Sequence, residues 1–188
     1  MKTVNIVLVG LGGQGILFMT KVLAQTALTK GLRIIGAETH GMAQRGGSVI
    51  SHLRLGDVQS SLVRTGSAHF LLALEENEAY RNIPFLAKGG SLYANAKTDH
   101  FPRAEVTPYL KKTGIICRSV PAGEIAMELG SPMSSNLALL GFFSAFHEGP
   151  LAYEDLRETI DHISPDRFKE INFKVLDASY KRGSLETE

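Results

Sequence analysis

Six residues near the amino terminus form a glycine-rich segment that is suited to binding an anion. Gly10-Leu11-Gly12-Gly13-Gln14-Gly15 contains the pattern Gly-x-Gly-x-x-Gly between an apolar run, Val4–Val9, and a helical pattern that starts at Ile16. Such a turn presents backbone N–H groups at the start of a helix, where the helix dipole also favours negative charge. We therefore expect an anion or cofactor phosphate, held jointly with a partner protein. The expected binding residues are Gly10, Gly12, Gly13, Gln14 and Gly15.

A second glycine-rich segment brings four kinds of reactive side chain together. It reads Glu38-Thr39-His40-Gly41-Met42-Ala43-Gln44-Arg45-Gly46-Gly47-Ser48 and follows a predicted strand, at the edge of an α/β sheet where ligands bind. Arg45 is suited to bidentate capture of a carboxylate or phosphate, and His40 can carry a proton near neutral pH. The candidate catalytic residues are Glu38, His40 and Arg45. The expected binding residues of this segment are Thr39, Gly41, Gln44, Gly46 and Gly47.

Both segments also have other interpretations. A glycine-rich turn can simply allow close packing, and Glu38 and Arg45 can form an ion pair that only shapes a loop at a subunit interface. Glu38 lies 23 residues after Gly15, close to the position of a ribose-binding acid, so a free-standing NAD-dependent dehydrogenase is one alternative. A pure interaction module is another. No metal site is expected, because His40 lacks a second ligand at suitable spacing.

The elements that would position these segments alternate between strand and helix. Val4–Val9 is an apolar, β-branched run of the kind buried in a parallel sheet, and residues 16–30 have apolar side chains at helical spacing. Further strands are expected at residues 32–37, 48–55, 58–63, 69–74, 91–95 and 114–120. Further helices are expected at residues 75–86, part of 102–112, 122–129, 135–146, 153–163 and from 164 onward. Residues 48–55 and 58–63 flank the turn signal Gly56-Asp57 and are expected to form a hairpin.

This order of elements predicts an α/β fold. We expect an open, mainly parallel twisted sheet with helices on both faces, a Rossmann-like start and an antiparallel hairpin at one edge. A length of 188 residues suits one domain, predicted over residues 1–180, followed by a charged tail over residues 181–188. Ser164 is expected to cap the last helix, and Asn136 the helix that starts at residue 135.

Composition excludes several classes of function. The net charge of +1 gives no electrostatic footprint for nucleic acid or for a membrane surface. No apolar run approaches the roughly 20 residues of a transmembrane helix, and the apolar start is too short for a signal peptide. The single cysteine, Cys117, can neither form an internal disulfide nor supply the several thiolates of an iron–sulfur cluster, so a cytoplasmic location is expected.

Taken together, the two glycine segments resemble those of the gamma-type subunit of the 2-oxoacid:ferredoxin oxidoreductases. The length of the chain and the order of its elements resemble that subunit along essentially the whole chain. The stretch from Glu38 to Arg45 points to the indolepyruvate branch, in its beta subunit, because pyruvate-type relatives usually lack that stretch. The resemblance implies that an aryl pyruvate, coenzyme A and oxidised ferredoxin give an aryl-acetyl-CoA, carbon dioxide and reduced ferredoxin. It also implies a large partner subunit that carries thiamine diphosphate and iron–sulfur clusters. A subunit of a pyruvate- or 2-oxoglutarate-type enzyme is the related alternative.

The chain itself lacks the residues for this redox chemistry. Gly56-Asp57-Val58 departs from the Gly-Asp-Gly that begins a thiamine motif, and no Asn-Asn pair follows it. We therefore expect no cofactor on this chain alone, no activity without the partner, and access to ferredoxin only through the complex. The glycine-rich edge is expected to dock over the partner's active site, exclude water, and position substrate or coenzyme A. Two roles stay open for Glu38, His40 and Arg45: action on substrate, or shaping of the interface.

Overall fold

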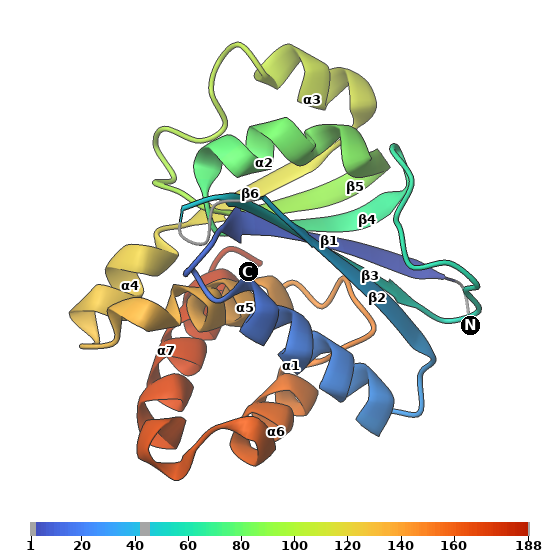
Figure 1. Cartoon of the computed structure of the whole chain (residues 1–188). Coiled ribbons are helices and arrows are strands. Elements are labelled where there is room, and N and C mark those ends of the chain that lie inside the picture. The colour runs from blue at the N-terminus through green and yellow to red at the C-terminus, as the bar shows by residue number, and fades with distance from the viewer. Residues whose placement is uncertain (1–2, 42–45, 188) are drawn as a thin grey trace.

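A computed structural model describes residues 3–41 and 46–187, and this part of the chain has an open, twisted six-stranded sheet at its centre (Figure 1). The strands are β1 (Val4–Leu11), β2 (Ile34–His40), β3 (Ser48–Leu55), β4 (Ala68–Ala73), β5 (Leu86–Asn95) and β6 (Ile116–Val120). Their order across the sheet is β2-β3-β1-β4-β5-β6. β1, β4, β5 and β6 are parallel, whereas β3 is antiparallel to both of its neighbours. The predicted mainly parallel sheet is confirmed.

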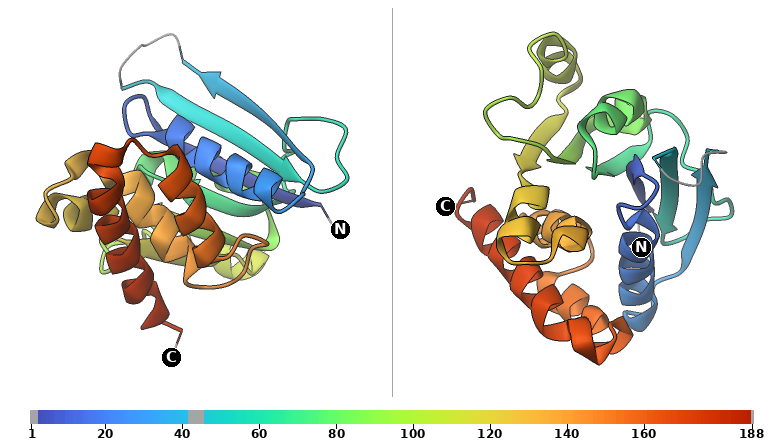
Figure 2. Two further views of the ribbon diagram at one scale, coloured as in Figure 1. Left: turned by 90° about the horizontal axis from the view of Figure 1, so that it is seen from below. Right: turned by 60° about the vertical axis from the view of Figure 1, so that its left-hand side comes forward.

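Helices cover both faces of the sheet, as predicted (Figure 2). Side chains alternate along β1, so that Ile6 and Leu8 pack on one face while Val7 and Val9 pack on the other. The first face is covered by α1 (Ile16–Thr29), α4 (Ala122–Glu128), α5 (Ser135–Ser144), α6 (Tyr153–Ile163) and α7 (Asp166–Ser184). The second face is covered by α2 (Glu76–Asn82) and α3 (Thr107–Thr113). Short 3₁₀ turns, η1 (Ile83–Phe85) and η2 (Pro132–Ser134), precede β5 and α5.

The antiparallel hairpin lies at one edge of the sheet, but the prediction of its two strands was half wrong. Its strands are β2 and β3, joined by the second glycine segment, and residues 58–63 form no strand. The reason is that β1 and β2 already occupy both edges of β3. Residues 58–63 instead cross one face of β3, where Val63 N donates to His52 Nδ1 at 3.4 Å and Arg54 Nη1 donates to Ser60 O at 2.8 Å.

Several predicted ends of elements were also wrong. The helix expected over residues 75–86 ends at Asn82, and a 3₁₀ turn containing Pro84 leads into β5, which starts at Leu86 rather than at residue 91. Ser164 does not cap α7: it lies at the end of α6, and its hydroxyl accepts from Asn172 Nδ2 at 3.1 Å. Helix α7 continues to Ser184, so the first part of the expected charged tail is helical.

Candidate functional site

The first glycine segment forms the turn between β1 and α1, and its own side chain closes it. Gln14 Oε1 accepts from Leu11 N at 2.7 Å, and Gln14 N donates to Leu11 O at 3.1 Å. A Cβ atom at Gly10 would lie 2.7 Å from Gln14 Oε1, so the closed turn requires glycine there. Gly13 and Gly15 have φ angles of +100° and +82°, which side chains rarely adopt. The conformation of the turn therefore explains why Gly10, Gly13 and Gly15 are glycines.

The turn leaves backbone donors free for an acceptor. The N–H groups of Leu11, Gly12 and Gln14 all have acceptors within the chain. Within the described residues, those of Gly13 and Gly15 have none. Gly15 lies at the start of α1, where the helix dipole places partial positive charge. Gly13 and Gly15, two of the residues expected to bind an anion, therefore have N–H groups available as donors.

The two glycine segments meet through backbone hydrogen bonds. Gly12 N donates to Gly47 O at 2.8 Å, and Gly46 N donates to Gly12 O at 3.3 Å. Gly41 N donates to Ser48 O at 3.1 Å, which closes the other side of the second segment. The structure thus brings the two segments together where β1 ends and β3 begins, and we call this part of the surface the glycine edge. Gln44 and the candidate Arg45 lie outside the described residues.

The other candidates of the second segment are exposed on the edge strand β2. Glu38 and His40 lie on the face that α1 covers, because both line hollows formed with α1 residues. Thr39, between them, points to the opposite face. His40 borders the hollow next to the glycine turn, whereas Glu38 lies further along the groove beside Thr20. The candidates therefore share a strand but not a single cavity.

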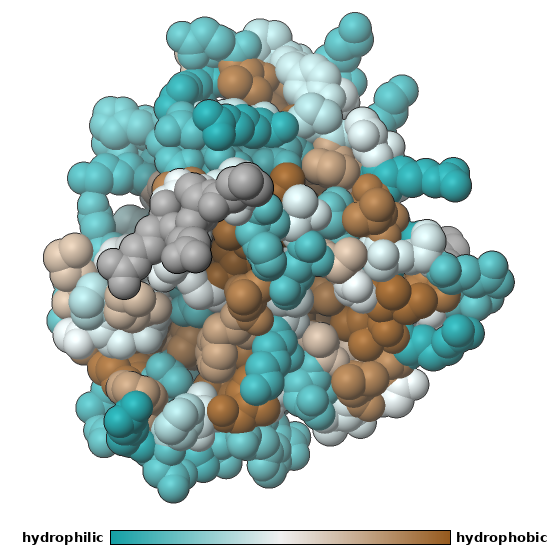
Figure 3. All heavy atoms as spheres, viewed as in Figure 1, coloured by the Kyte–Doolittle hydropathy of each residue, from teal (hydrophilic) through white to brown (hydrophobic). Residues whose placement is uncertain are grey.

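One cavity lies between the glycine turn, the start of α1 and the ends of β2 and β3. We call it the Phe18 cavity, and its volume is about 620 Å³. It is lined by Leu11, Gly12, Gly13, Gly15, Ile16, Leu17, Phe18, His40, Gly41 and Val49. Apolar side chains dominate this wall, and Leu17 is 50% exposed. Figure 3 shows apolar surface in this region, over the first part of α1. The cavity combines apolar walls with glycine backbone and one imidazole.

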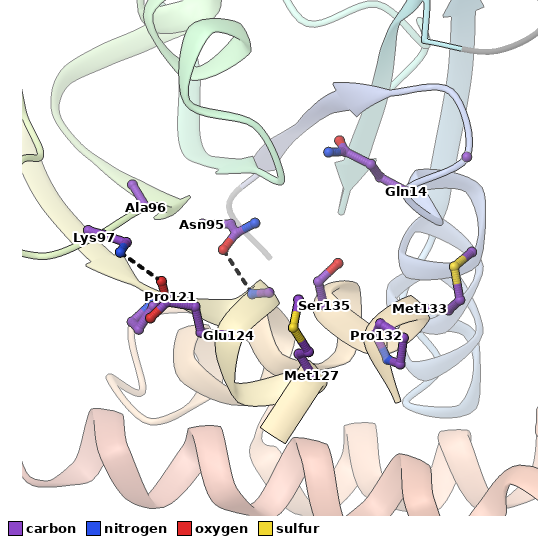
Figure 4. A pocket seen from close by; sticks show the side chains of 12 residues that line it. Gln14, Asn95, Ala96, Lys97, Pro121, Glu124, Met127, Pro132, Met133 and Ser135 are labelled. Carbon is purple, nitrogen blue, oxygen red and sulfur yellow. Dashed lines mark hydrogen bonds and ion pairs between the residues drawn. The ribbon is translucent and has the colours of Figure 1, made fainter. Parts of the chain in front are cut away.

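A second cavity lies on the other side of the turn, at the carboxyl ends of β5 and β6 (Figure 4). We call it the Lys97 cavity, and its volume is about 460 Å³. It is lined by Gly13, Gln14, Asn95, Ala96, Lys97, Pro121, Gly123, Glu124, Met127, Pro132, Met133 and Ser135. Lys97 Nζ pairs with Glu124 Oε1 at 3.1 Å, and the hydrogen bond to that carboxylate raises the pKa of Lys97. The site therefore has one ion pair at its rim.

Two asparagines that the sequence did not assign to the site hold it together. Asn95 Oδ1 accepts from Gly123 N at 3.0 Å and its Nδ2 donates to Leu74 O at 3.2 Å, which joins β5, α4 and the end of β4. Asn136 was expected to cap α5, but it donates through Nδ2 to Gly15 O at 3.2 Å. This bond joins the start of α5 to the glycine turn. The only sequence signal was that each asparagine lies at the end of a predicted element.

Metal and thiol chemistry find no support in the described residues. No group of three or more His, Cys, Asp and Glu side chains there is arranged to hold a metal ion. Burial raises the pKa of the Cys117 thiol to about 11, which disfavours the thiolate that a nucleophile needs.

In the described part of the chain, no helix has both the length and the apolarity to cross a membrane.

Comparison with known proteins gives the family. The chain is 35% identical to "Indolepyruvate oxidoreductase subunit IorB" of Archaeoglobus fulgidus, over 95% of this chain and 94% of the relative. Its fold matches a keto/oxoacid ferredoxin oxidoreductase gamma subunit from Geobacter sulfurreducens, with a TM-score of 0.75, 20% identity and coverage of 97% and 99% of the two chains.

A longer protein contains the same fold as one part of its chain. The structure of 2-oxoglutarate:ferredoxin oxidoreductase from Magnetococcus marinus, with 2-oxoglutarate, coenzyme A and succinyl-CoA bound, matches with a TM-score of 0.80 and 18% identity. The match covers 98% of this chain and 32% of the other. Residues 5–182 match the family described as pyruvate ferredoxin/flavodoxin oxidoreductase. The chain therefore belongs to the pyruvate ferredoxin/flavodoxin oxidoreductase family.

Proposed function

We propose that this chain is the small subunit of an indolepyruvate-type 2-oxoacid:ferredoxin oxidoreductase. The complex would convert an aryl pyruvate and coenzyme A into an aryl-acetyl-CoA and carbon dioxide, and the electrons released would reduce ferredoxin. Relatives that are 31–35% identical over most of their length are named as subunits of indolepyruvate oxidoreductase, which supports this substrate class. A larger catalytic partner would complete the enzyme.

The joining of Gly12 to Gly47 is the observation that carries this proposal. It makes one continuous edge from two glycine-rich segments, with the Phe18 and Lys97 cavities on either side of the first turn. Gly13, whose N–H group is free, lines both cavities, and Gly15, whose N–H group is also free, lines the Phe18 cavity. An edge with donors but no redox group suits a subunit that completes another subunit's active site.

The chemistry of the edge favours coenzyme A or a 2-oxoacid as the ligand. The phosphates of coenzyme A suit the N–H donors at the start of α1, and apolar walls suit its uncharged arm or an aryl ring. Arg45 would supply charge to a phosphate or carboxylate, and His40 would contact the ligand from the rim of the Phe18 cavity. The walls would also exclude water from the reacting centre.

Thiamine diphosphate and the iron–sulfur clusters would belong to the partner subunit. Thiamine diphosphate supplies the carbanion chemistry of decarboxylation, and the clusters pass electrons to ferredoxin. This chain has one cysteine and departs from a thiamine motif at Gly56-Asp57-Val58. Its own contribution would be binding, orientation and exclusion of water.

Strand order argues against a free-standing NAD-dependent dehydrogenase. In dinucleotide folds the strand that carries the ribose-binding acid lies next to the first strand. Here β3 lies between β1 and β2, so Glu38 is one strand further from the glycine turn. That extra spacing of about 4.8 Å moves the carboxylate away from a ribose whose pyrophosphate is at the turn.

Co-expression with a large subunit of the indolepyruvate type would test the proposal. The purified complex should reduce ferredoxin with indolepyruvate only when coenzyme A is present, and each subunit alone should be inactive. A complex that prefers pyruvate or 2-oxoglutarate would move the chain to another branch. Micromolar binding of NAD to this chain alone would favour the dehydrogenase.

A further inference from the structure

Helix α2 carries a buried carboxylate that the proposed function does not yet use. The Glu78 side chain is only 2% exposed, although Glu78 lies in the first turn of a short helix. Charged side chains are rarely buried unless they are paired and hydrogen-bonded. The contacts of this carboxylate therefore indicate what it does.

Each carboxylate oxygen of Glu78 has one partner. Oε1 accepts from Arg81 Nη1 at 2.7 Å, one turn along the same helix. Oε2 accepts from Ser48 Oγ at 2.6 Å, across 30 residues of sequence. Glu75 caps the helix by accepting from Glu78 N at 2.8 Å, so the Glu78 side chain is not needed as a cap. The long-range bond to Ser48 is what distinguishes this residue.

Ser48 is the point at which the second glycine segment ends. It is the first residue of β3, and it is paired with Leu11, the last residue of β1. Its carbonyl accepts from Gly41 N, while the preceding residues, Gly46 and Gly47, bond to Gly12. The backbone of Ser48 thus bonds to Gly41, on the other side of the second segment, and pairs with Leu11 at the start of the first turn.

We infer that Glu78 is a positioning residue, which holds the closing end of the second glycine segment against the first through the Ser48 hydroxyl. The inference rests on the proposed function for its effect on catalysis. Helix α2 packs beneath β1 and β4, so the carboxylate ties the edge to the rigid sheet. The first turn would then present the N–H groups of Gly13 and Gly15 to a ligand in a fixed geometry, as a precise binding site requires.

The test compares variants of the chain assembled with its large subunit. Ser48→Ala removes the hydroxyl, and Ser48→Thr restores it. Glu78→Gln keeps an oxygen acceptor for Ser48 and removes the ion pair with Arg81. Thr159→Val is the matched control, because it removes a buried hydrogen bond, 2.8 Å between Thr26 Oγ1 and Thr159 Oγ1, at the far end of α1.

Four readouts distinguish positioning from a merely structural role: KM for coenzyme A and indolepyruvate, kcat, melting temperature, and hydrogen exchange in peptides that contain Gly12 and Gly46. Ser48→Ala should raise KM for coenzyme A about tenfold and speed exchange in both peptides. Ser48→Thr should restore both values, and Glu78→Gln should cause a smaller rise in KM. Thr159→Val should lower the melting temperature alone.

Two results would overturn the inference. One is a Ser48→Ala complex that melts earlier but keeps its KM values and exchange rates, as the control does. The other is a rise in KM for coenzyme A in Ser48→Thr that is as large as the rise in Ser48→Ala. If the wild-type complex does not use indolepyruvate but Ser48→Ala still speeds exchange at Gly12 and Gly46, the positioning role stands and the proposed function fails.

Discussion

Gly12 N donates to Gly47 O at 2.8 Å, and this bond joins the two glycine segments through residues that are 35 positions apart in the sequence. Neither segment alone forms a site: the first is a strand-to-helix turn, and the second connects β2 to β3. The bond exists because β3 is antiparallel to β1, so that the start of β3 lies beside the end of β1.

Alanine substitutions at two glycines of the turn should differ in cost. Gly15→Ala places a Cβ atom 2.5 Å from Asn136 Nδ2 and forces a side chain into positive φ. Gly13→Ala is the matched control, because its φ is also positive but no atom lies within 4 Å of the added Cβ. We expect Gly13→Ala to lower the free energy of unfolding by about 1–2 kcal/mol and Gly15→Ala by about 1 kcal/mol more. Urea denaturation would measure both, and equal losses would contradict the contact with Asn136.

Arg45→Ala should reduce turnover of the assembled complex without unfolding it. A guanidinium that binds a carboxylate or phosphate at the glycine edge stabilises the bound state, so kcat/KM should fall about a hundredfold. Steady-state kinetics with indolepyruvate and coenzyme A would measure the loss. Arg64→Ala, at an exposed position away from the edge, is the control. Unchanged kcat/KM in Arg45→Ala would remove this residue from the site.

The stability of the chain should fall as the pH drops below about 6.5, partly because of His52. Burial lowers the pKa of His52 below its ordinary value of 6.5, and its Nδ1 accepts from Val63 N. The unfolded chain therefore binds a proton more readily than the folded chain, so stability is retained above the unfolded pKa and lost as the pH falls toward the folded pKa.

Thermal melts at several pH values would test this contribution. His52→Gln should flatten the change in melting temperature between pH 7.5 and pH 5, values chosen about one unit or more on either side of the ordinary pKa. His100→Gln is the control, because the His100 side chain is 77% exposed. An equally steep acid dependence in His52→Gln and wild type would show that other groups are responsible.

The purified chain without its partner should show no iron–sulfur absorbance and no coenzyme A-dependent oxidation of indolepyruvate. One cysteine cannot supply the ligands of a cluster, so reconstitution with iron and sulfide should also fail. Adding the large subunit should produce activity that saturates at a fixed subunit ratio. Reduction of ferredoxin by the single chain would contradict the assignment of redox chemistry to the partner.

The sequence alone determined the features that depend on neighbouring residues. The apolar run of β1, the glycine turn and the helical periodicity of α1 are local patterns, and the structure has them in that order. The same holds for α6, whose predicted bounds, Tyr153–Ile163, are those observed. The family also followed from the residues of the two glycine segments, because it depends on a contiguous pattern.

Only the tertiary structure decided which distant residues meet. Residues 58–63 have the composition of a strand, but β3 had no free edge for them, and that depends on the order of all the strands. Asn136 had the local signal of a helix cap, yet it bonds to Gly15, which is 121 residues away. Glu78 had no signal in sequence at all, because its burial and its bond to Ser48 arise only when α2 packs on the sheet. Contacts of this kind depend on how whole elements pack together, so the propensities of neighbouring residues do not predict them.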